Sequence, residues 1–371
     1  MTMQSLARQR GLSLIELMIA LLLSATLLWG VLQIFDGNRN TMRMQTAFAR
    51  VQESGRFATD LLVKEIRMAD YWGCAPDQDS IENHLDVNDD DYTNSTVQAL
   101  YDQIGANGIA GVDNTSGASV GGMTVLDGTD VLTLRGSEDA CGGVGRMVPS
   151  TQAAALHVSA QCQVASGEIV LLTNCQSGEL MTITSVQGEG GCSTSGGGNS
   201  ASASTGTGTG TDTSKKTITH NTGNCNLAGA VDNATKVLQR QYGADARILK
   251  PYQRTYFIAA SGAAGGNSLY VADTGASPME LVPGIDDLQI LYGRDTDGDE
   301  VVDGWVAASS NAVQMEQAIA IKVQLVAASD SGVNADDLTV KDLDGVDTTY
   351  SDGRLRKVYL SVAKVRNRGR L

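Results

Sequence analysis

The most apolar part of the chain lies near its N-terminus. Residues 12–35 read LSLIELMIALLLSATLLWGVLQIF and contain one charged side chain, Glu16. As an α-helix this segment would be about 36 Å long, which is enough to cross a hydrocarbon layer of about 30 Å. Arg8 and Arg10 precede it. Because basic residues favour the cytoplasmic side, the pattern predicts a single membrane span with the N-terminus in the cytoplasm and the bulk of the chain outside.

An amphipathic pattern follows directly after the apolar segment. Between Met44 and Ala69 the apolar residues, Phe48 among them, recur mostly every three or four positions, and charged residues occupy the other faces. This spacing predicts a helix whose apolar stripe packs on a globular unit. The first proline of the chain is Pro76, so no proline interrupts the helix.

We therefore expect one continuous helix from about Ser13 to Ala69, roughly 85 Å long. Residues 12–35 would be its membrane or filament-core part, and residues 36–70 its amphipathic continuation. Residues 71–371 would form the head.

Beyond residue 75 the pattern changes to short runs rich in β-branched residues and bounded by Gly, Asn, Asp and Ser. Such runs are typical of antiparallel strands. They occupy residues 131–134, 168–172, 180–183, 256–259, 268–271, 319–325 and 358–365. Together with the helix they predict an α+β fold, in which a long spine helix packs against a β-rich head.

A segment of low complexity interrupts the head. Residues 193–213 contain only Ser, Thr, Gly, Ala, Asn and one Asp. Without large apolar side chains such a segment cannot offset the entropy lost on ordering, so we predict a flexible surface loop at 193–224.

Composition and charge exclude several classes of function. Acidic residues outnumber basic ones by 42 to 27, which gives a formal net charge of -15. Nucleic acid is therefore not an expected partner, because phosphate binding needs a basic surface. The sequence also has no G-x-S-x-G elbow, P-loop or HExxH motif, so we expect no enzymatic activity.

The chain has six cysteines, all beyond the apolar segment. An even number in an oxidising compartment predicts disulfides, and six cysteines allow 15 pairings. Nearest-neighbour pairing would give Cys74–Cys141, Cys162–Cys175 and Cys192–Cys225, the last of which would close the low-complexity loop. A zinc site is disfavoured, because no CxxC spacing occurs and the three histidines are scattered.

An acidic loop, DTDGDEVVD, is the best candidate for a metal site. Asp295, Asp297, Asp299 and Asp303 stand at its positions 1, 3, 5 and 9, and the carbonyl of Val301 would add an oxygen at position 7. Calcium takes six to eight oxygen ligands, so calcium is the ion that we expect, with weak affinity.

The loop resembles DxDxD calcium loops, including those of dockerins and thrombospondin repeats, but it departs from the EF-hand pattern. Glu300 replaces the glycine at position 6, and Val306 replaces the acidic residue at position 12. The alternative interpretation is a solvated hairpin turn between residues 288–292 and 304–306, in which Asp and Gly serve the turn.

The N-terminal residues resemble a known processing signal. Gly11-Leu12-Ser13-Leu14-Ile15-Glu16-Leu17 and the apolar run after it are similar to the class III signal of type IV prepilins and pseudopilins. The resemblance implies that a prepilin peptidase removes leader residues 1–11 by cleaving between Gly11 and Leu12, where the family usually has Phe, and that the new N-terminus is methylated. It also implies that Glu16 faces the N-terminal amine of a neighbouring subunit.

Further stretches resemble the PilW family of minor pilins. They are Gln52–Ala58, Glu65–Ala69, Tyr71–Cys74, Leu291–Asp299, Ile319–Ala327 and Val358–Arg368 with its Arg366-Asn367-Arg368. This resemblance implies a role in priming type IV pilus assembly, and hence in twitching motility, with other minor pilins and the major pilin as partners and a tip adhesin as a further one. A minor pseudopilin of type II secretion and a single-span anchored periplasmic binding protein are the alternatives.

Overall fold

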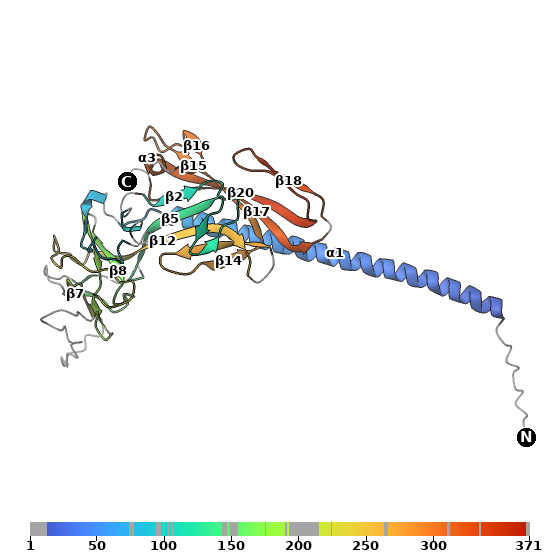
Figure 1. Ribbon diagram of the computed structural model, residues 1–371, viewed down its shortest axis with the longest axis horizontal. Helices are drawn as coiled ribbons and strands as arrows, with labels where there is room; N and C mark the ends of the chain where they lie inside the picture. Colours follow the sequence, from blue (N-terminus) through green and yellow to red (C-terminus); the bar gives the residue numbers. More distant parts are fainter. Residues whose placement is uncertain are drawn as a thin grey trace, which may run out of the picture.

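A computed structural model gives the fold (Figure 1). It describes residues 13–368 except for 74–77, 94–97, 99, 103, 105–106, 143–146, 149–154, 175, 190, 193–214, 224, 263–265, 310–311 and 334. Gly11, Leu12, Cys74 and Cys175 therefore lie outside the described residues.

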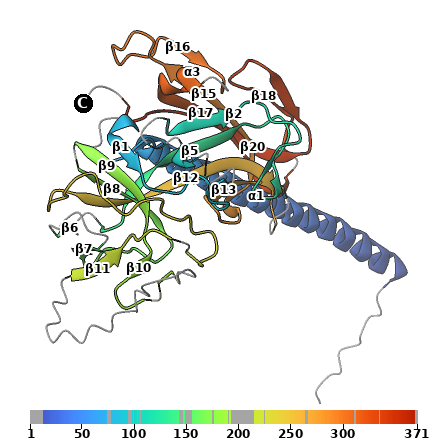
Figure 2. The same cartoon turned by 60° about the vertical axis from the view of Figure 1, so that its left-hand side comes forward.

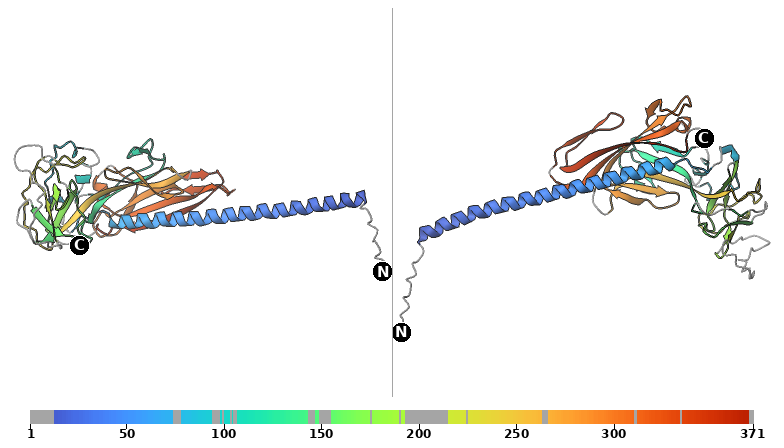
Figure 3. Two further views of the ribbon diagram at one scale, coloured as in Figure 1. Left: turned by 90° about the horizontal axis from the view of Figure 1, so that it is seen from below. Right: turned by 180° about the vertical axis from the view of Figure 1, so that it is seen from behind.

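The first element is the helix α1, Leu14–Met68, which is continuous over 55 residues. Its N-terminal half projects away from the rest of the molecule, and its C-terminal half lies along the head (Figure 3). This confirms the predicted spine helix to within one residue at each end. Its buried positions are Ala47, Val51, Gly55, Ala58, Leu62 and Ile66.

The buried stripe of α1 differs from the prediction at its start. Ala47 is buried there, whereas Phe48 is 49 % exposed. From Gly55 the buried positions run back in steps of four through Val51 to Ala47, so Phe48 falls on the neighbouring face. The size of Phe48 made it the more obvious core residue, but helix geometry places the smaller side chain inwards.

The sheet that α1 contacts most contains β15 (Ile285–Arg294), β16 (Gly304–Val306), β17 (Ala318–Gly332) and β20 (Arg354–Lys364). It has the order β16-β15-β17-β20, and all of its pairs are antiparallel. The short helix α3, Ala312–Glu316, joins β16 to β17. We call α1 from Ala47 onwards and this sheet the spine region.

The largest sheet has eight strands and is organised by one long strand, β12 (Arg247–Ala260). The first half of β12 pairs with β8, and its second half pairs with β13. The remaining strands extend the sheet on both sides: β1 (Ile81–Asn83), β2 (Ile109–Val112), β5 (Val131–Asp139), β8 (Ile169–Asn174), β9 (Ser177–Thr182), β13 (Asn267–Asp273) and β14 (Met279–Pro283). All seven apolar runs predicted from the sequence are strands.

A smaller sheet lies at the end of the head that is far from the projecting helix (Figure 2). It has the order β10-β11-β7-β6 and consists of β6 (Met147–Val148), β7 (Ala155–Ser159), β10 (Ser185–Val186) and β11 (Lys215–Thr219). We call this sheet, with β1, β8 and β9 beside it, the outer region. The 3-10 turn Gln78–Ser80 precedes β1, and the hairpins β3 (Ser119–Val120)–β4 (Met123–Thr124) and β18 (Leu338–Lys341)–β19 (Asp347–Tyr350) complete the described elements.

The predicted flexible loop at 193–224 is corrected at its C-terminal end. Residues 193–214 lie outside the described residues, but Lys215–Thr219 form β11, which pairs with β7 and β10. Within this strand Ile218 is fully buried, whereas Lys215 is exposed. That burial supplies the apolar contact that the low-complexity residues lack.

The disulfides differ from nearest-neighbour pairing. Cys141 is bonded to Cys162, so the predicted bonds Cys74–Cys141 and Cys162–Cys175 are wrong. Pairing depends on proximity in space: Gln163 donates its backbone N–H to the carbonyl of Ala140, which brings the two cysteines together. The Cys192–Cys225 bond is present as predicted. Both bonds lie in the outer region.

Candidate functional site

The projecting half of α1 presents an unbroken apolar surface. Every large apolar side chain from Leu14 to Phe35 is at least half exposed in the single chain, and this part of the helix has the length and composition of a membrane span. Glu16 is the only ionisable side chain within it and is also exposed. An apolar patch this large on one molecule is an interaction site for lipid or for other apolar helices.

The buried half of α1 is fixed to the sheet by a close approach at Gly55. The ring of Tyr359, on β20, lies so near the helix that a Cβ built at Gly55 would be 2.1–2.6 Å from its carbon atoms. The Tyr359 hydroxyl donates a hydrogen bond of 3.1 Å to the carbonyl of Val51. Only glycine at position 55 leaves room for this ring.

The C-terminal segment of the chain closes the end of the spine helix. The side-chain amide of Asn367 donates to the carbonyls of Ala69 at 2.8 Å and Met68 at 3.3 Å, and the N–H of Arg366 donates to the carbonyl of Arg67. The last carbonyls of a helix have no partner within the helix. Here residues about 300 positions later in the chain supply the donors.

Arg368 continues this closure with a buried guanidinium group. It forms an ion pair with Asp70 and donates to the carbonyl of Ala318 at 3.0 Å and to the side-chain oxygen of Asn107 at 2.6 Å. Asp70 follows the helix cap with a φ of 62°, a conformation that usually requires glycine. Its carboxylate also accepts from the indole N–H of Trp72. We call Arg366, Asn367 and Arg368 the C-terminal clamp.

Sequence reasoning found the clamp residues only through resemblance and did not assign them a role. Arg366-Asn367-Arg368 has no helical or strand periodicity and no motif spacing that points to residue 70. The one available signal was that Asp70, and not glycine, follows Ala69, so the usual C-capping residue is missing at that position.

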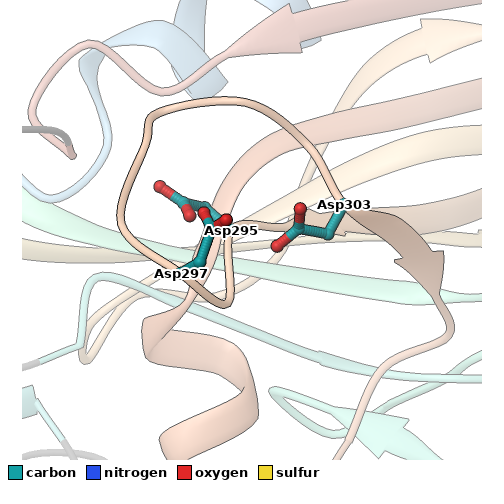
Figure 4. Close-up of side chains that lie close together, drawn as sticks. All are labelled: Asp295, Asp297 and Asp303. Carbon is teal, nitrogen blue, oxygen red and sulfur yellow. The ribbon is translucent and has the colours of Figure 1, made fainter.

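The acidic loop joins β15 to β16 in an antiparallel hairpin, as the turn interpretation predicted. Figure 4 shows that Asp295, Asp297 and Asp303 point toward one another across the loop. One carboxylate oxygen of each lies within 4.8 Å of the others. Three such carboxylates can hold a metal ion.

One of the four predicted carboxylate ligands, Asp299, does not belong to this cluster. The Asp299 carboxylate accepts the backbone N–H of Val301 at 2.8 Å and so serves a local turn. Asp299 is not among the three converging carboxylates, and the Val301 carbonyl stays a predicted ligand. The left-handed backbone at Gly298 and Glu300 redirects the chain after Asp297, which the alternating spacing of the sequence did not anticipate.

The loop orients its carboxylates through backbone donors. Asp295 accepts N–H groups from Gly298 at 2.7 Å and Glu300 at 2.8 Å. Desolvation raises the pKa of Asp295, but the backbone donors, Glu300 first, outweigh it and lower that pKa. The Thr296 hydroxyl and N–H lower the pKa of Asp303 in the same way.

Asp297 is the least satisfied carboxylate of the cluster. The Asp299 N–H lowers the pKa of Asp297, but the negative charge of Asp299, desolvation and the charges of Asp303 and Asp295 outweigh this donor and raise that pKa. The loop therefore holds negative charge that a cation would neutralise.

Comparisons with known proteins match the two ends of the chain. The family model described as Type IV Pilus-assembly protein W matches residues 255–367, and the one described as Prokaryotic N-terminal methylation motif matches residues 6–32. No curated protein and no solved structure gives a significant match. The first model covers most of the strands that pack against α1 and the clamp as far as Asn367, and the second covers the start of the exposed helix.

A long helix whose N-terminal half is apolar and exposed and whose C-terminal half packs on a β-rich head defines the class of type IV pilin-like proteins. Within this class, the two family matches support a PilW-like minor pilin of the type IV pilus. Pilin domains of this kind are structural rather than enzymatic. The matches also place the chain in the context of pilus assembly, with other pilins and processing by a prepilin peptidase, and indicate membrane anchoring through α1.

Proposed function

We propose that the chain primes or joins type IV pilus assembly as a processed minor pilin, held first in the inner membrane with its head in the periplasm. The observation that carries this proposal is the contrast between the two halves of α1. One half is locked to the sheet, and the other is apolar and exposed. Such a surface is stable only in lipid or against other apolar helices, so assembly moves it from the first environment to the second.

Glu16 supplies the register of that packing. A carboxylate at the centre of a membrane helix costs about 2.5–3.5 kcal/mol on insertion scales. Cleavage between Gly11 and Leu12 creates an α-amino group at Leu12, and the amine of a neighbouring subunit neutralises Glu16 only when the two helices are aligned. The head is acidic overall, because removal of Arg8 and Arg10 with the leader changes the net charge from −15 to −17. The head contacts other minor pilins, the major pilin and a tip adhesin.

N-terminal mass spectrometry of the protein from its native membrane, with and without the prepilin peptidase, tests the proposal. We expect a methylated chain that starts at Leu12 when the peptidase is present and at Met1 when it is absent. An intact Met1 in the presence of the peptidase would overturn the pilin assignment and leave a plain membrane anchor.

Replacement of Glu16 separates assembly from processing. We expect Glu16→Val to be cleaved normally but to be lost from sheared pili, whereas Glu53→Gln, on the exposed face of the same helix, should be retained. Deletion of the gene should abolish piliation. If it abolished protein secretion and left pili intact, the chain would be a minor pseudopilin instead.

We further propose that the acidic loop binds calcium weakly through Asp295, Asp297 and Asp303. The convergence of three carboxylates and the electrostatic repulsion at Asp297 support this. Isothermal titration with calcium should give binding that Asp297→Asn abolishes and that Asp90→Asn, in another exposed acidic cluster, leaves unchanged. Equal heats for all three proteins would show that the loop is only a turn.

A further inference from the structure

A groove separates α1 from the end of the head that points along the projecting helix. It has a volume of about 780 Å³ and lies between Phe35–Arg50 on the helix and Ser329–Val333 at the end of β17. The helix side combines two kinds of side chain. Phe35 and Met42 are apolar, and Arg39, Arg43 and Arg50 are cationic.

Two of these arginines are available to bind a ligand. Arg50 forms an ion pair with Asp330 across the groove. Arg39 and Arg43 are exposed, and their guanidinium groups have no hydrogen-bond or ion-pair partner within the described part of the chain. Because residues four positions apart lie on one face of a helix, the two groups point to the same side. The nearby acidic residue Asp36 does not line the groove.

The position of the groove along the helix indicates its environment. It begins at Phe35, the last residue of the apolar segment, so it starts where the hydrocarbon layer ends. With a rise of 1.5 Å per residue, Arg39 lies about 6 Å and Arg43 about 12 Å beyond Phe35. The headgroup layer on each side of a bilayer is roughly 5–8 Å thick, so Arg39 lies within it. Arg43 lies a few ångströms beyond it, and its long side chain leans back toward the layer because helical side chains tilt toward the helix N-terminus.

We propose that this groove binds the phosphate of an anionic phospholipid headgroup from the outer leaflet before the subunit leaves the membrane. The two free guanidinium groups match the charge and geometry of a phosphate, and Phe35, at the edge of the hydrocarbon layer, matches the start of the acyl chains. The contact also offsets the repulsion between a chain of net charge -15 and an anionic membrane surface. This inference rests on the proposed membrane stage of the minor pilin.

The test uses the full chain in nanodiscs of equimolar phosphatidylglycerol and phosphatidylcholine, with native mass spectrometry of the lipids that remain bound. We expect phosphatidylglycerol to be enriched on the wild type. Each arginine that is replaced should lower the enrichment about fivefold, so the double variant Arg39→Gln plus Arg43→Gln should lose about 25-fold. Lys64→Gln plus Arg67→Gln, exposed cations of the same helix outside the groove, is the matched control and should keep the enrichment. Arg39→Lys plus Arg43→Lys should keep most of it.

Several results would overturn the inference. Unchanged enrichment in the double glutamine variant would show that the groove does not select lipid. An equal loss in the control would assign the effect to bulk charge. Cross-linking from the groove to the head of a second pilin instead of to lipid would identify a protein partner. Failure of the wild type to enter nanodiscs at all would contradict the proposed membrane stage itself, a result that is distinct from insertion without selectivity.

Discussion

The spine region and the outer region are stabilised in different ways. The spine region has one continuous apolar core, to which the stripe of α1 and the strands β15, β17 and β20 contribute. The outer region has smaller separate clusters, two disulfides and a buried polar group around Glu179. Glu179 contacts the ring of His84 and accepts the N–H of Gln239 and the hydroxyl of Tyr242.

The two regions therefore differ in the source of their stability. Long strands and a long helix bury enough apolar surface to stabilise the spine region without covalent help. The short strands of the outer region bury less, so the disulfide cross-links have to contribute more. The Type IV Pilus-assembly protein W match falls largely on the spine region and does not reach the strands of the smaller sheet. The outer region therefore lies largely outside the residues that this family model matches.

The largest expected effect breaks the C-terminal clamp. Arg368→Ala leaves Asp70 buried without its cation, so we expect the free energy of unfolding of the full chain in detergent to fall by about 3–5 kcal/mol. Arg366→Ala, whose side chain is exposed, should change it by less than about 0.5 kcal/mol. Urea denaturation followed by circular dichroism measures both, and equal effects would contradict the assigned role of Arg368.

The second effect is confined to the outer region. Replacement of Cys141 and Cys162 by serine should destabilise that region by about 2–4 kcal/mol, because the disulfide restricts the unfolded chain. Hydrogen exchange with mass spectrometry should show faster exchange in β7 and β11 and no change in β17 and β20. Uniform acceleration would mean that the two regions unfold as one unit.

Acidification should act on the two regions with opposite sign. Burial lowers the pKa of His220, in the outer region, to about 4. The unfolded chain takes up this proton near pH 6.5, so stability that is present above pH 6.5 is lost as the pH falls toward 4, by up to about 3 kcal/mol.

Near the spine region, burial raises the pKa of Asp130 to about 7 and that of Asp287 to about 6. There the folded state holds the protons more tightly, so stability rises as the pH falls from 7 toward 4. Two single-tryptophan variants separate the regions by fluorescence. Trp29→Phe plus Trp305→Phe leaves Trp72, which packs beside the outer region, and Trp29→Phe plus Trp72→Phe leaves Trp305 on β16 of the spine region. His220→Gln should remove the acid sensitivity detected at Trp72; its persistence would point to another group.

The smallest effect probes the contact between helix and sheet. Gly55→Ala forces the Tyr359 ring to move, which should cost about 1–3 kcal/mol despite the better helix propensity of alanine. Gly37→Ala on the same helix meets no atom within 4 Å and should stabilise the chain by up to about 1 kcal/mol. Thermal unfolding of the two variants compares them directly; a stabilised Gly55→Ala would refute the close packing.

Local patterns in the sequence determined the elements of this protein. The spacing of apolar residues was sufficient to predict α1, with its apolar segment up to Phe35, and the seven strand segments, because helix and strand periods are properties of neighbouring residues. The same holds for the hairpin turn at Asp295–Asp303, where Asp and Gly satisfy the local backbone.

Only the tertiary structure decided which distant residues meet. It paired Cys141 with Cys162, selected three of the acidic loop's oxygen donors, placed Tyr359 on Gly55 and brought Arg368 to Asp70. These contacts follow from strand order and from the left-handed turns at residues such as Asp70 and Gly298. Sequence periodicity carries no information on strand order, because it describes which face of an element is buried and not which element covers that face.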